Sequence, residues 1–264
     1  MIQIDNLHVW FGRGTPLENH ALRGVSLEIP QGQFITVIGS NGAGKSTLLN
    51  ALAGEITVSD GFIRIDGADI THLPPHKRAL RVARVFQDPM AGTCENLTIE
   101  ENLALAVRRG RTRSLRPALR KADIGLFRER LAGLNLGLEN RLKDRMGLLS
   151  GGQRQAVSLL MATLVPSDVL LLDEHTAALD PKTAAFVIEL TRRIVEEQKL
   201  TAMMVTHSMR QALDVGDRTL MLHGGQVAFD VSGDKREGLD VPDLLALFSR
   251  RQGEALSDDS LLLG

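Results

Sequence analysis

Cysteine, net charge and long hydrophobic runs are all scarce in this sequence. Cys94 is the only cysteine among 264 residues, so no disulfide can form within the chain, which fits a reducing compartment. The 31 basic and 32 acidic side chains nearly cancel, so no overall field favours nucleic acid as a partner. No apolar run approaches the roughly 18 residues of a membrane span, and the N-terminus lacks signal-peptide features. We therefore expect a cytoplasmic protein without a nucleic-acid partner.

Short apolar runs alternate with helical patterns along the chain, which predicts an α/β fold. Between about residues 88 and 160 the pattern is mostly helical, and Thr98 with Glu101 predicts a capping box. The tail after about residue 250 is expected to fray. The predicted strands are 2–11, 22–29, 34–39, 62–66, 169–173 and 201–207, with a hairpin over 219–230 that turns at Gly224-Gly225. Besides the helix that follows Thr98, helices are predicted at 46–54, about 118–133 and 186–198.

The stretch GSNGAGKST fits the phosphate-loop pattern G-x-x-x-x-G-K-[ST]. It lies between a predicted buried strand and a predicted helix, the context that such a loop requires, which disfavours an ordinary glycine-rich turn. Glycines let successive N–H groups face one anion, and the helix adds its positive end. The Lys45 side chain is expected to contact the β- and γ-phosphates, and the Ser46 hydroxyl is expected to bind Mg²⁺. The predicted nucleotide-binding residues here are Gly39, Ser40, Asn41, Gly42, Ala43, Gly44, Lys45, Ser46 and Thr47.

Two acidic residues follow the apolar run VLLL at residues 169–172. Asp173 ends this predicted strand, where ligands of open α/β sheets bind, so we expect it to face the metal. Glu174 comes next, and its carboxylate is suited to hold and polarise an attacking water. A strand that ends in solvated acids is the ordinary alternative, but the phosphate loop in the same chain makes it the weaker interpretation.

A second glycine-containing stretch, LSGGQ at residues 149–153, precedes the apolar run AVSLLMATL. Ser150, Gly151 and Gly152 are predicted to form a flexible loop that opens a helix and offers a second anion site. Nucleotide kinases and GTPases have no need of this element. One chain therefore carries two predicted phosphate-binding loops.

With these motifs in order, the sequence resembles the ATP-binding cassette ATPases over about residues 2–230. The resemblance implies a P-loop NTPase core with an N-terminal antiparallel β subdomain and a helical insert. GSNGAGKST then corresponds to Walker A, VFQDP to the Q-loop, LSGGQ to the signature, VLLLDE to Walker B, AALD to the D-loop and VTHS to the switch histidine. Phe11 matches the family's aromatic residue that stacks on adenine, and neighbouring Trp10 is the alternative residue for this role.

The resemblance also assigns roles to individual residues. It implies a head-to-tail homodimer in which each ATP lies between the Walker A of one chain and the signature of the other. The implied catalytic residues are Glu174, His207 and Gln87, and the implied Mg²⁺ ligands are Ser46, Gln87 and Asp173. The implied nucleotide contacts outside Walker A are Phe11, Ser150, Gly151, Gly152, Gln153 and Asp180.

His175 is a departure, because the family usually has proline after the catalytic glutamate. This position is not expected to touch phosphate, and the departure points to a bacterial importer-like subgroup with amino acids as candidate cargo. The run RRGRTRSLR at 108–116 is expected to be a solvated loop rather than a site for RNA or anionic lipid.

The resemblance leaves two functions to weigh. The first is an ATPase subunit that powers a separate integral membrane permease from the inner face of the membrane, in a system that could include a substrate-binding protein. The second is a soluble cassette ATPase for DNA repair or ribosome work; a small-molecule kinase is disfavoured by LSGGQ. Residues 1–250 are expected to form one cassette domain, with 88–160 as its helical insert and 251–264 as a tail. The permease is expected to contact residues 88–102, through Met90, Leu97 and Ile99.

Overall fold

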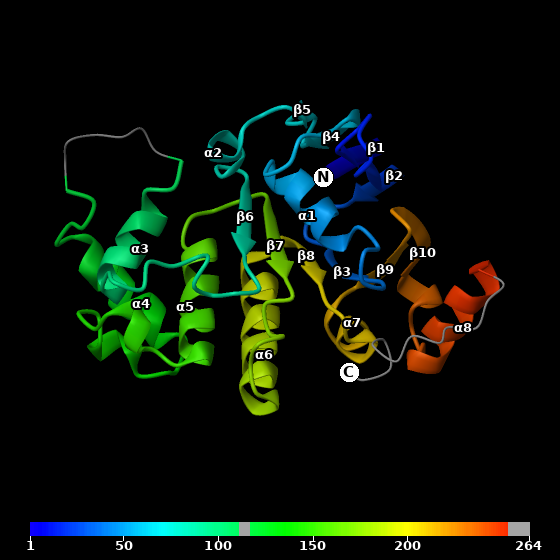
Figure 1. Ribbon diagram of the computed structural model, residues 1–264. Helices are drawn as coiled ribbons and strands as arrows, with labels where there is room; N and C mark the ends of the chain where they lie inside the picture. Colours follow the sequence, from blue (N-terminus) through cyan, green and yellow to red (C-terminus); the bar gives the residue numbers. More distant parts are fainter. Residues whose placement is uncertain (111–116, 253–264) are drawn as a thin grey trace. The chain divides into compact units, whose positions relative to one another are not determined.

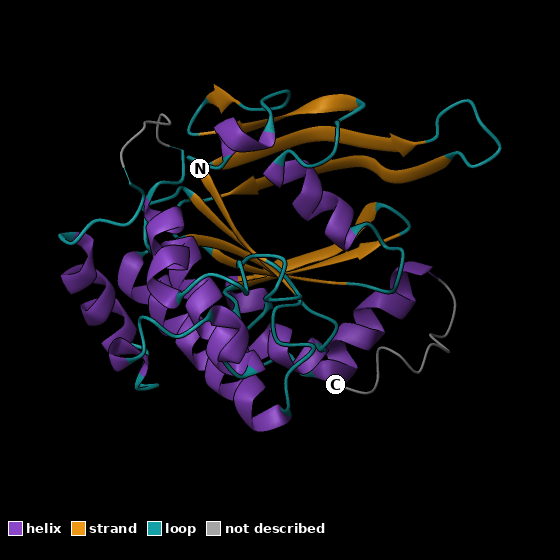
Figure 2. Cartoon of the chain, turned by 60° about the vertical axis from the view of Figure 1, so that its left-hand side comes forward, coloured by secondary structure: helices purple, strands orange, loops and turns teal. Residues whose placement is uncertain are grey.

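The computed structural model describes residues 1–110 and 117–252. The chain divides into two compact units, one made of Met1–Arg78 with the chain from Lys199 onward, the other of Ala79–Gln198. Both units combine strands with helices (Figures 1 and 2). The structure is a mixed α/β fold with an antiparallel sheet and a parallel sheet, which confirms the predicted class.

The first unit contains the antiparallel sheet, in the order β2-β1-β4-β5. Its strands are β1 (Ile2–Phe11), β2 (Asn19–Ile29), β4 (Asp60–Ile65) and β5 (Ala68–Asp69). Apolar side chains such as Ile2 and Ile4 are buried at alternate positions, as a strand with one covered face requires. β2 begins three residues earlier than predicted.

The same unit contains a group of parallel strands centred on β3 (Phe34–Ile38), which is buried along its whole length. β3 pairs in parallel with β8 (Thr201–Val205) and with β9 (Arg218–His223). β10 (Gln226–Ser232) returns antiparallel to β9 through a two-residue turn. Both turn residues, Gly224 and Gly225, have positive φ angles of 53° and 81°, which explains the glycine pair and confirms the predicted hairpin.

Four α-helices and a short 3₁₀ turn at Gly233–Lys235 complete the described part of the first unit. The α-helices are α1 (Lys45–Ala53), α2 (Pro75–Arg78), α7 (Met209–Val215) and α8 (Val241–Gln252). The sequence reading did not anticipate α8. Its residues Leu244 and Phe248 are buried in a cluster with Met209, Met221 and Phe229, so packing against α7 and the β9–β10 hairpin stabilises it.

The second unit contains the parallel pair β6 (Val82–Val85) and β7 (Val169–Asp173). Its helices are α3 (Ile99–Val107), α4 (Asp123–Ala132), α5 (Gly151–Thr163) and α6 (Pro181–Gln198), with short 3₁₀ turns at Leu138–Asn140 and Met146–Leu148. The predicted capping box of Thr98 and Glu101 is present at the start of α3. α4 is shorter than predicted, and α6 begins at Pro181, five residues earlier than predicted.

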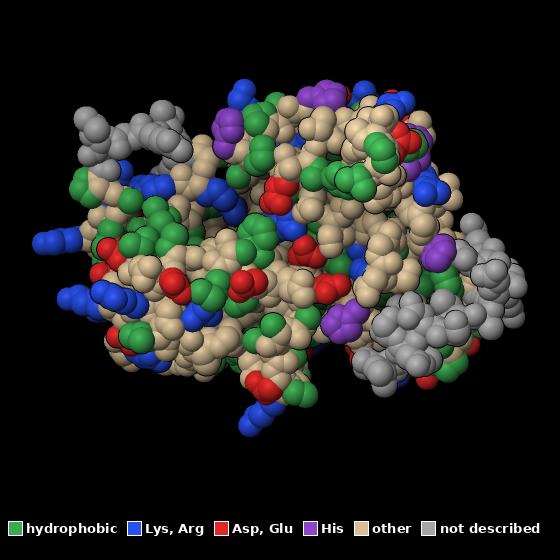
Figure 3. Space-filling model, viewed as in Figure 1, with side chains coloured by type: hydrophobic (Ala, Val, Ile, Leu, Met, Phe, Trp, Pro, Cys, Tyr) green, Lys and Arg blue, Asp and Glu red, His purple; other side chains and the backbone are tan. Residues whose placement is uncertain are grey.

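Two sequence expectations fall wholly or partly outside the described residues. These are the basic run at 108–116, of which 111–116 are not described, and the tail from 253 onward. Within residues 1–110 and 117–252, no helix is both long and apolar enough to cross a bilayer. On the face drawn in Figure 3, acidic and basic side chains are interspersed. The proposed extent of one cassette domain over residues 1–250 stays a prediction.

His175 is buried between the end of β7 and α6, with only 2 % of its surface exposed. Its Nε2 lies 3.0 Å from Thr191 Oγ1, whose hydroxyl donates to the carbonyl of Val187. The Thr191 oxygen therefore accepts the Nε2–H of a neutral imidazole. Burial disfavours the imidazolium and lowers the pKa of His175 to about 4.

This burial predicts an acid sensitivity of folding. Between pH 6.5 and about 4, His175 of the unfolded chain binds a proton that the folded chain excludes, so the free energy of unfolding falls as the pH falls. At pH 5 the loss from this group is about 2 kcal/mol. Thermal unfolding at pH 7 and pH 5 should show a smaller pH-dependent loss for His175→Leu than for wild type. The exposed His76→Gln should behave as wild type, and equal losses in all three proteins would contradict this account of His175.

Candidate nucleotide-binding site

The glycine loop follows β3 directly, and packing explains two of its three glycines. A Cβ on Gly39 would lie 2.2 Å from the carbonyl oxygen of Leu222 on β9, and one on Gly44 would lie 2.8 Å from the carbonyl oxygen of Ala21 on β2. Gly44 also has a φ angle of 101°, where side chains are strained. The loop backbone is therefore held closely between neighbouring strands, in a conformation that only glycine supplies at these points.

Lys45 begins α1 and turns its side chain back into the loop. Its Nζ donates to the carbonyls of Gly39 at 2.6 Å and Ser40 at 3.1 Å, and the residue is only 7 % exposed. In the described structure, α1 has neither a side-chain cap at Gly44 nor an acidic residue in its first turn. A buried ammonium and an uncapped helix N-terminus are both features that attract anions, so the geometry is suited to phosphate.

His207 lies at the same edge of the first unit's parallel strands as this loop. β3 and β8 are parallel with Val37 opposite Val205, and Thr206 N donates to the carbonyl of Val37. Gly39 and His207 each lie two residues beyond this registered pair. The structure thus brings the exposed His207 to the end of the strand beside the one that leads into the loop.

The two aromatic candidates for adenine stacking differ in their surroundings. The Trp10 ring stacks on His20, with 3.7 Å between centroids and 10° between planes. His20 also hydrogen-bonds His8 through ring nitrogens 3.0 Å apart. Phe11 is 42 % exposed. One Trp10 face is therefore covered within the chain, and Phe11 is the more accessible candidate.

The second unit presents a corresponding edge built from β6 and β7. Val85 pairs with Leu172 in parallel register, so Gln87 and Glu174 each lie two residues beyond the pair, and Asp173 lies with them. Gln87 is exposed, whereas Asp173 and Glu174 are half-buried. Glu174 has a φ angle of 42°, unusual for a residue with a side chain, and such outliers often occur at functional sites. The two acids and Gln87 thus converge at one edge, as the sequence predicts for Asp173.

Asp173 has a partner that the sequence reading missed. Arg84 Nη2 lies 2.6 Å from Asp173 Oδ2, and the two side chains are 11 % and 13 % exposed. The guanidinium also lies 4.7 Å from the centre of the Phe86 ring. A basic residue inside the otherwise apolar run VARV was the available signal, because a charge in a buried strand requires a partner.

The signature stretch differs from the prediction in one respect. α5 begins at Gly151, so Gly151 and Gly152 lie in the first helical turn and not in a flexible loop. Ser150 is the N-cap, and it forms a capping box with Gln153. A Cβ on Gly152 would lie 2.1 Å from Thr183 Cγ2, so this glycine permits α5 and α6 to approach closely. The predicted helix N-terminus is present at Ser150, but close packing explains Gly152.

Asp180, the predicted acid of the D-loop, lies just before α6. Its Oδ1 accepts from Thr183 N at 3.1 Å, and hydrogen bonds from the Thr183 side chain and backbone lower the pKa of Asp180. The residue is exposed. It therefore caps the start of α6 as an ionised carboxylate.

Comparison with known proteins agrees with these motifs. A family model described as ABC transporter matches residues 22–177. The chain is 47 % identical to a tyrosine transport ATP-binding protein of Clostridioides difficile, over 94 % of this chain and 98 % of that protein. It is 33 % identical to the thiamine import ATP-binding protein ThiQ of Escherichia coli, over 81 % and 88 % of the two chains.

A solved structure shows the same fold. It is the dimeric post-hydrolysis state of the ATP-binding cassette MJ0796 bound to ADP and phosphate, with a TM-score of 0.73 and 28 % identity over 88 % of this chain and 98 % of that one. The family match covers more than half of the chain, and the tyrosine transport relative is aligned over nearly its full length. The chain therefore belongs to the ABC transporter family, as an ATP-binding cassette ATPase.

Proposed function

We propose that this ATPase energises a separate membrane permease in an import system, with amino acids as the cargo class. The single observation that carries this proposal is the 47 % identity to a tyrosine transport ATP-binding protein over 94 % of the chain. Its location would be the inner face of the membrane, held there by the permease. The relatives named above are transport proteins, so they give no support to a repair or ribosome-associated ATPase.

The phosphate loop is proposed to bind the ATP phosphates. The Lys45 ammonium now donates to two loop carbonyls, and anionic phosphate oxygens are stronger acceptors for it. The first-turn N–H groups of α1 would complete the site, and Phe11 would stack on adenine. His207, at the same strand edge, would contact the γ-phosphate.

The residues proposed for Mg²⁺ fit that ion. Ser46, Gln87 and Asp173 supply hydroxyl, amide and carboxylate oxygens, the hard donors that Mg²⁺ prefers. Among the described residues there is no cluster of three His, Cys, Asp or Glu side chains that could hold a metal by itself. That agrees with an ion bound by a few protein oxygens together with phosphates. When bound, Mg²⁺ would neutralise charge on the phosphate oxygens.

Glu174 is the proposed general base. Its carboxylate would orient a water molecule and accept its proton, while Gln87 at the same edge would help to hold that water. The φ angle of 42° at Glu174 sets the direction in which the side chain leaves the end of β7.

Glu174→Gln should therefore keep ATP binding and lower the hydrolysis rate by about 10²–10⁴-fold, because the amide keeps the shape of the carboxylate without its basicity. Phosphate release and equilibrium ATP binding measure the two effects separately. Lys45→Ala should weaken ATP binding itself, because the phosphate-facing charge is lost. The exposed Glu197→Gln serves as a matched control and should behave as wild type. Full turnover by Glu174→Gln would rule out this residue as the base.

A homodimer formed on ATP binding is the second part of the proposal. The dimeric cassette found by structural comparison supports it. The capped start of α5 offers N–H groups at a helix N-terminus, a second place for phosphate oxygens. ATP held by the phosphate loop of one chain would meet this helix start on the other chain.

Ser150→Arg should prevent this dimerisation, because a long side chain would fill the space before α5. Sedimentation velocity with ATP, in a Glu174→Gln background, should show dimers when Ser150 is retained and monomers for the Ser150→Arg variant. Ser150→Ala is the control, since it removes the cap at a cost of about 1 kcal/mol but leaves the space open. A dimer that forms equally in all three proteins, or without ATP, would contradict the shared site.

The permease is proposed to dock on an apolar groove of the second unit. This groove has a volume of about 320 Å³, and its apolar lining includes Leu97, Ala104, Leu105 and Leu119. Leu97 was among the predicted contacts. Ile99 was also predicted to contact the permease, but it is the first residue of α3 and is fully buried, so that part of the prediction is wrong.

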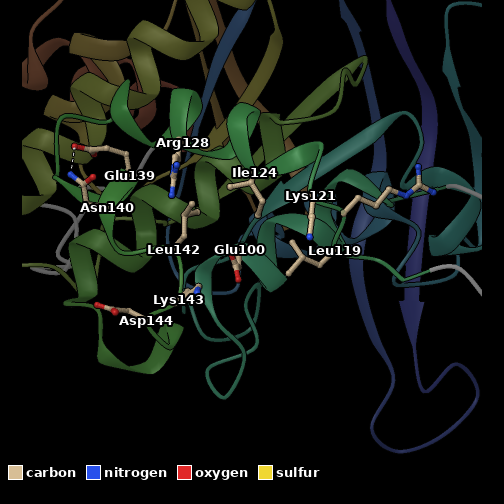
Figure 4. Close-up of a pocket in the computed structure, with 11 residues that line it drawn as sticks. Glu100, Leu119, Lys121, Ile124, Arg128, Glu139, Asn140, Leu142, Lys143 and Asp144 are labelled. Atoms are coloured by element: carbon tan, nitrogen blue, oxygen red, sulfur yellow. Dashed lines mark hydrogen bonds between the residues drawn. The ribbon is translucent and has the colours of Figure 1, made fainter.

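A larger hollow of about 520 Å³ adjoins this groove through Leu119 (Figure 4). Ile124 and Leu142 give it an apolar part, and its charged lining is mixed, with four basic and three acidic side chains: Arg120, Lys121, Arg128, Lys143, Glu100, Glu139 and Asp144. Together the two hollows fit a short amphipathic helix whose apolar face is flanked by charged residues of both signs. A cytoplasmic helix of the permease is the proposed occupant.

Leu105→Glu should uncouple transport, because it places a charge in the groove through a side chain that is already 46 % exposed. Cargo uptake and co-purification with the permease should both fall, while the isolated subunit still hydrolyses ATP. Leu126→Glu, on an exposed leucine of α4 outside both hollows, is the matched control. Unchanged uptake by Leu105→Glu would place the docking site elsewhere.

A further inference from the structure

Arg84 and Asp173 form an ion pair at the end of the strand pair that carries the proposed metal ligand. The register places Arg84 opposite Leu171, and Asp173 lies two residues further along β7. Side chains two apart share a face of a strand, so Arg84, Phe86 and Asp173 all lie on one face of the pair. The long Arg84 side chain runs along that face to reach the carboxylate, at 2.6 Å.

Two features of this pair suggest more than a surface salt bridge. Both side chains are nearly 90 % buried, so each charge needs the other to offset its lost hydration. The Arg84 guanidinium also lies against the Phe86 ring, which fixes its position. Asp173 Oδ2 is therefore held in one orientation, with its negative charge already balanced.

We propose that Arg84 is a positioning residue with two effects. It orients Asp173, and it raises the metal concentration needed to half-saturate the site in the presence of nucleotide. This inference rests on the proposed function, in which Asp173 serves Mg²⁺. A carboxylate paired with a guanidinium attracts a divalent cation less strongly than an unpaired one, because the fixed positive charge opposes the incoming one. Arg84 would thus weaken metal binding by Asp173 in the absence of ATP, so that the metal binds together with the nucleotide.

The chain contains a matched comparison for this role. Arg81 Nε lies 2.5 Å from Asp168 Oδ2, so a second Arg–Asp pair joins the start of β6 to the residue just before β7. This pair lies at the opposite end of the same two strands from Asp173. The Arg81–Asp168 side chains are more exposed, at 28 % and 37 %, so breaking this pair should cost less stability, and the comparison therefore concerns Mn²⁺ binding and not stability.

The experiment measures metal binding and turnover separately in Arg84→Met, Arg84→Lys and Arg81→Met. Electron paramagnetic resonance with Mn²⁺ as the probe, in the presence of a non-hydrolysable ATP analogue, gives the half-saturating metal concentration. Arg84→Met should lower this concentration about tenfold, because an opposing unit charge is removed. Its kcat should also fall, because Asp173 loses its orientation.

The two other variants decide between positioning and a purely structural role. Arg84→Lys keeps the charge and should bind Mn²⁺ within about twofold of wild type, and Arg81→Met should leave both Mn²⁺ binding and kcat unchanged. An unchanged or increased half-saturating concentration in folded Arg84→Met would overturn the inference. Circular dichroism establishes that each variant is folded.

Failure of the inference can be distinguished from failure of the proposed function. If wild type with the ATP analogue binds no more Mn²⁺ than the analogue alone, the proposed metal site is wrong. If wild type binds it and Arg84→Met matches wild type, only the role of Arg84 is wrong.

Discussion

Parallel pairing of strands is the constraint on which the candidate site depends. β3 lies beside β8 in the first unit and β6 lies beside β7 in the second, each in parallel register. Parallel strands end at the same edge, so the segments that follow them are brought together whatever their separation in sequence. Gly39 and His207 come to the same edge in this way although they are 168 positions apart, and Gln87 and Glu174 do so although they are 87 positions apart.

Backbone packing then holds the phosphate loop in position. Gly225, in the turn between β9 and β10, donates its N–H to the Ala43 carbonyl and accepts from Arg23 N. Gly44 approaches the backbone of β2 so closely that a side chain there would collide with it. The loop is thus supported by strands β2, β9 and β10, and such support is what preorganises N–H groups for an anion.

Much of the fold and site could be predicted from sequence, because the relevant signals are local. Buried strands such as β3 appear as continuous apolar runs, and the capping box at Thr98 and the turn at Gly224-Gly225 require particular residues at fixed spacing. The order of short motifs identified the family. The site residues assigned through that resemblance remain predictions, and the structure supports them by the strand ends that they occupy.

What the sequence did not reveal depends on contacts between distant residues. α8 is stabilised by its burial against α7 and β10, although Leu244, Leu245 and Phe248 also recur at helical spacing, a local signal that the prediction did not use. The Arg84–Asp173 pair joins residues 89 positions apart, which no local pattern specifies. Ile99 was taken for an exposed contact because its segment follows the Q-loop, but the helix phase set by the Thr98 cap turns it inward.

The central claim to test is that the segments that follow both strand pairs, β3–β8 in the first unit and β6–β7 in the second, respond to ATP. Hydrogen–deuterium exchange, measured with and without Mg²⁺ and a non-hydrolysable ATP analogue, tests it most directly. The account predicts slower exchange in residues 39–47 and, at the same nucleotide concentration, in residues 85–88 and 173–175. Slower exchange in the phosphate loop alone, with no change at the ends of β6 and β7, would contradict it.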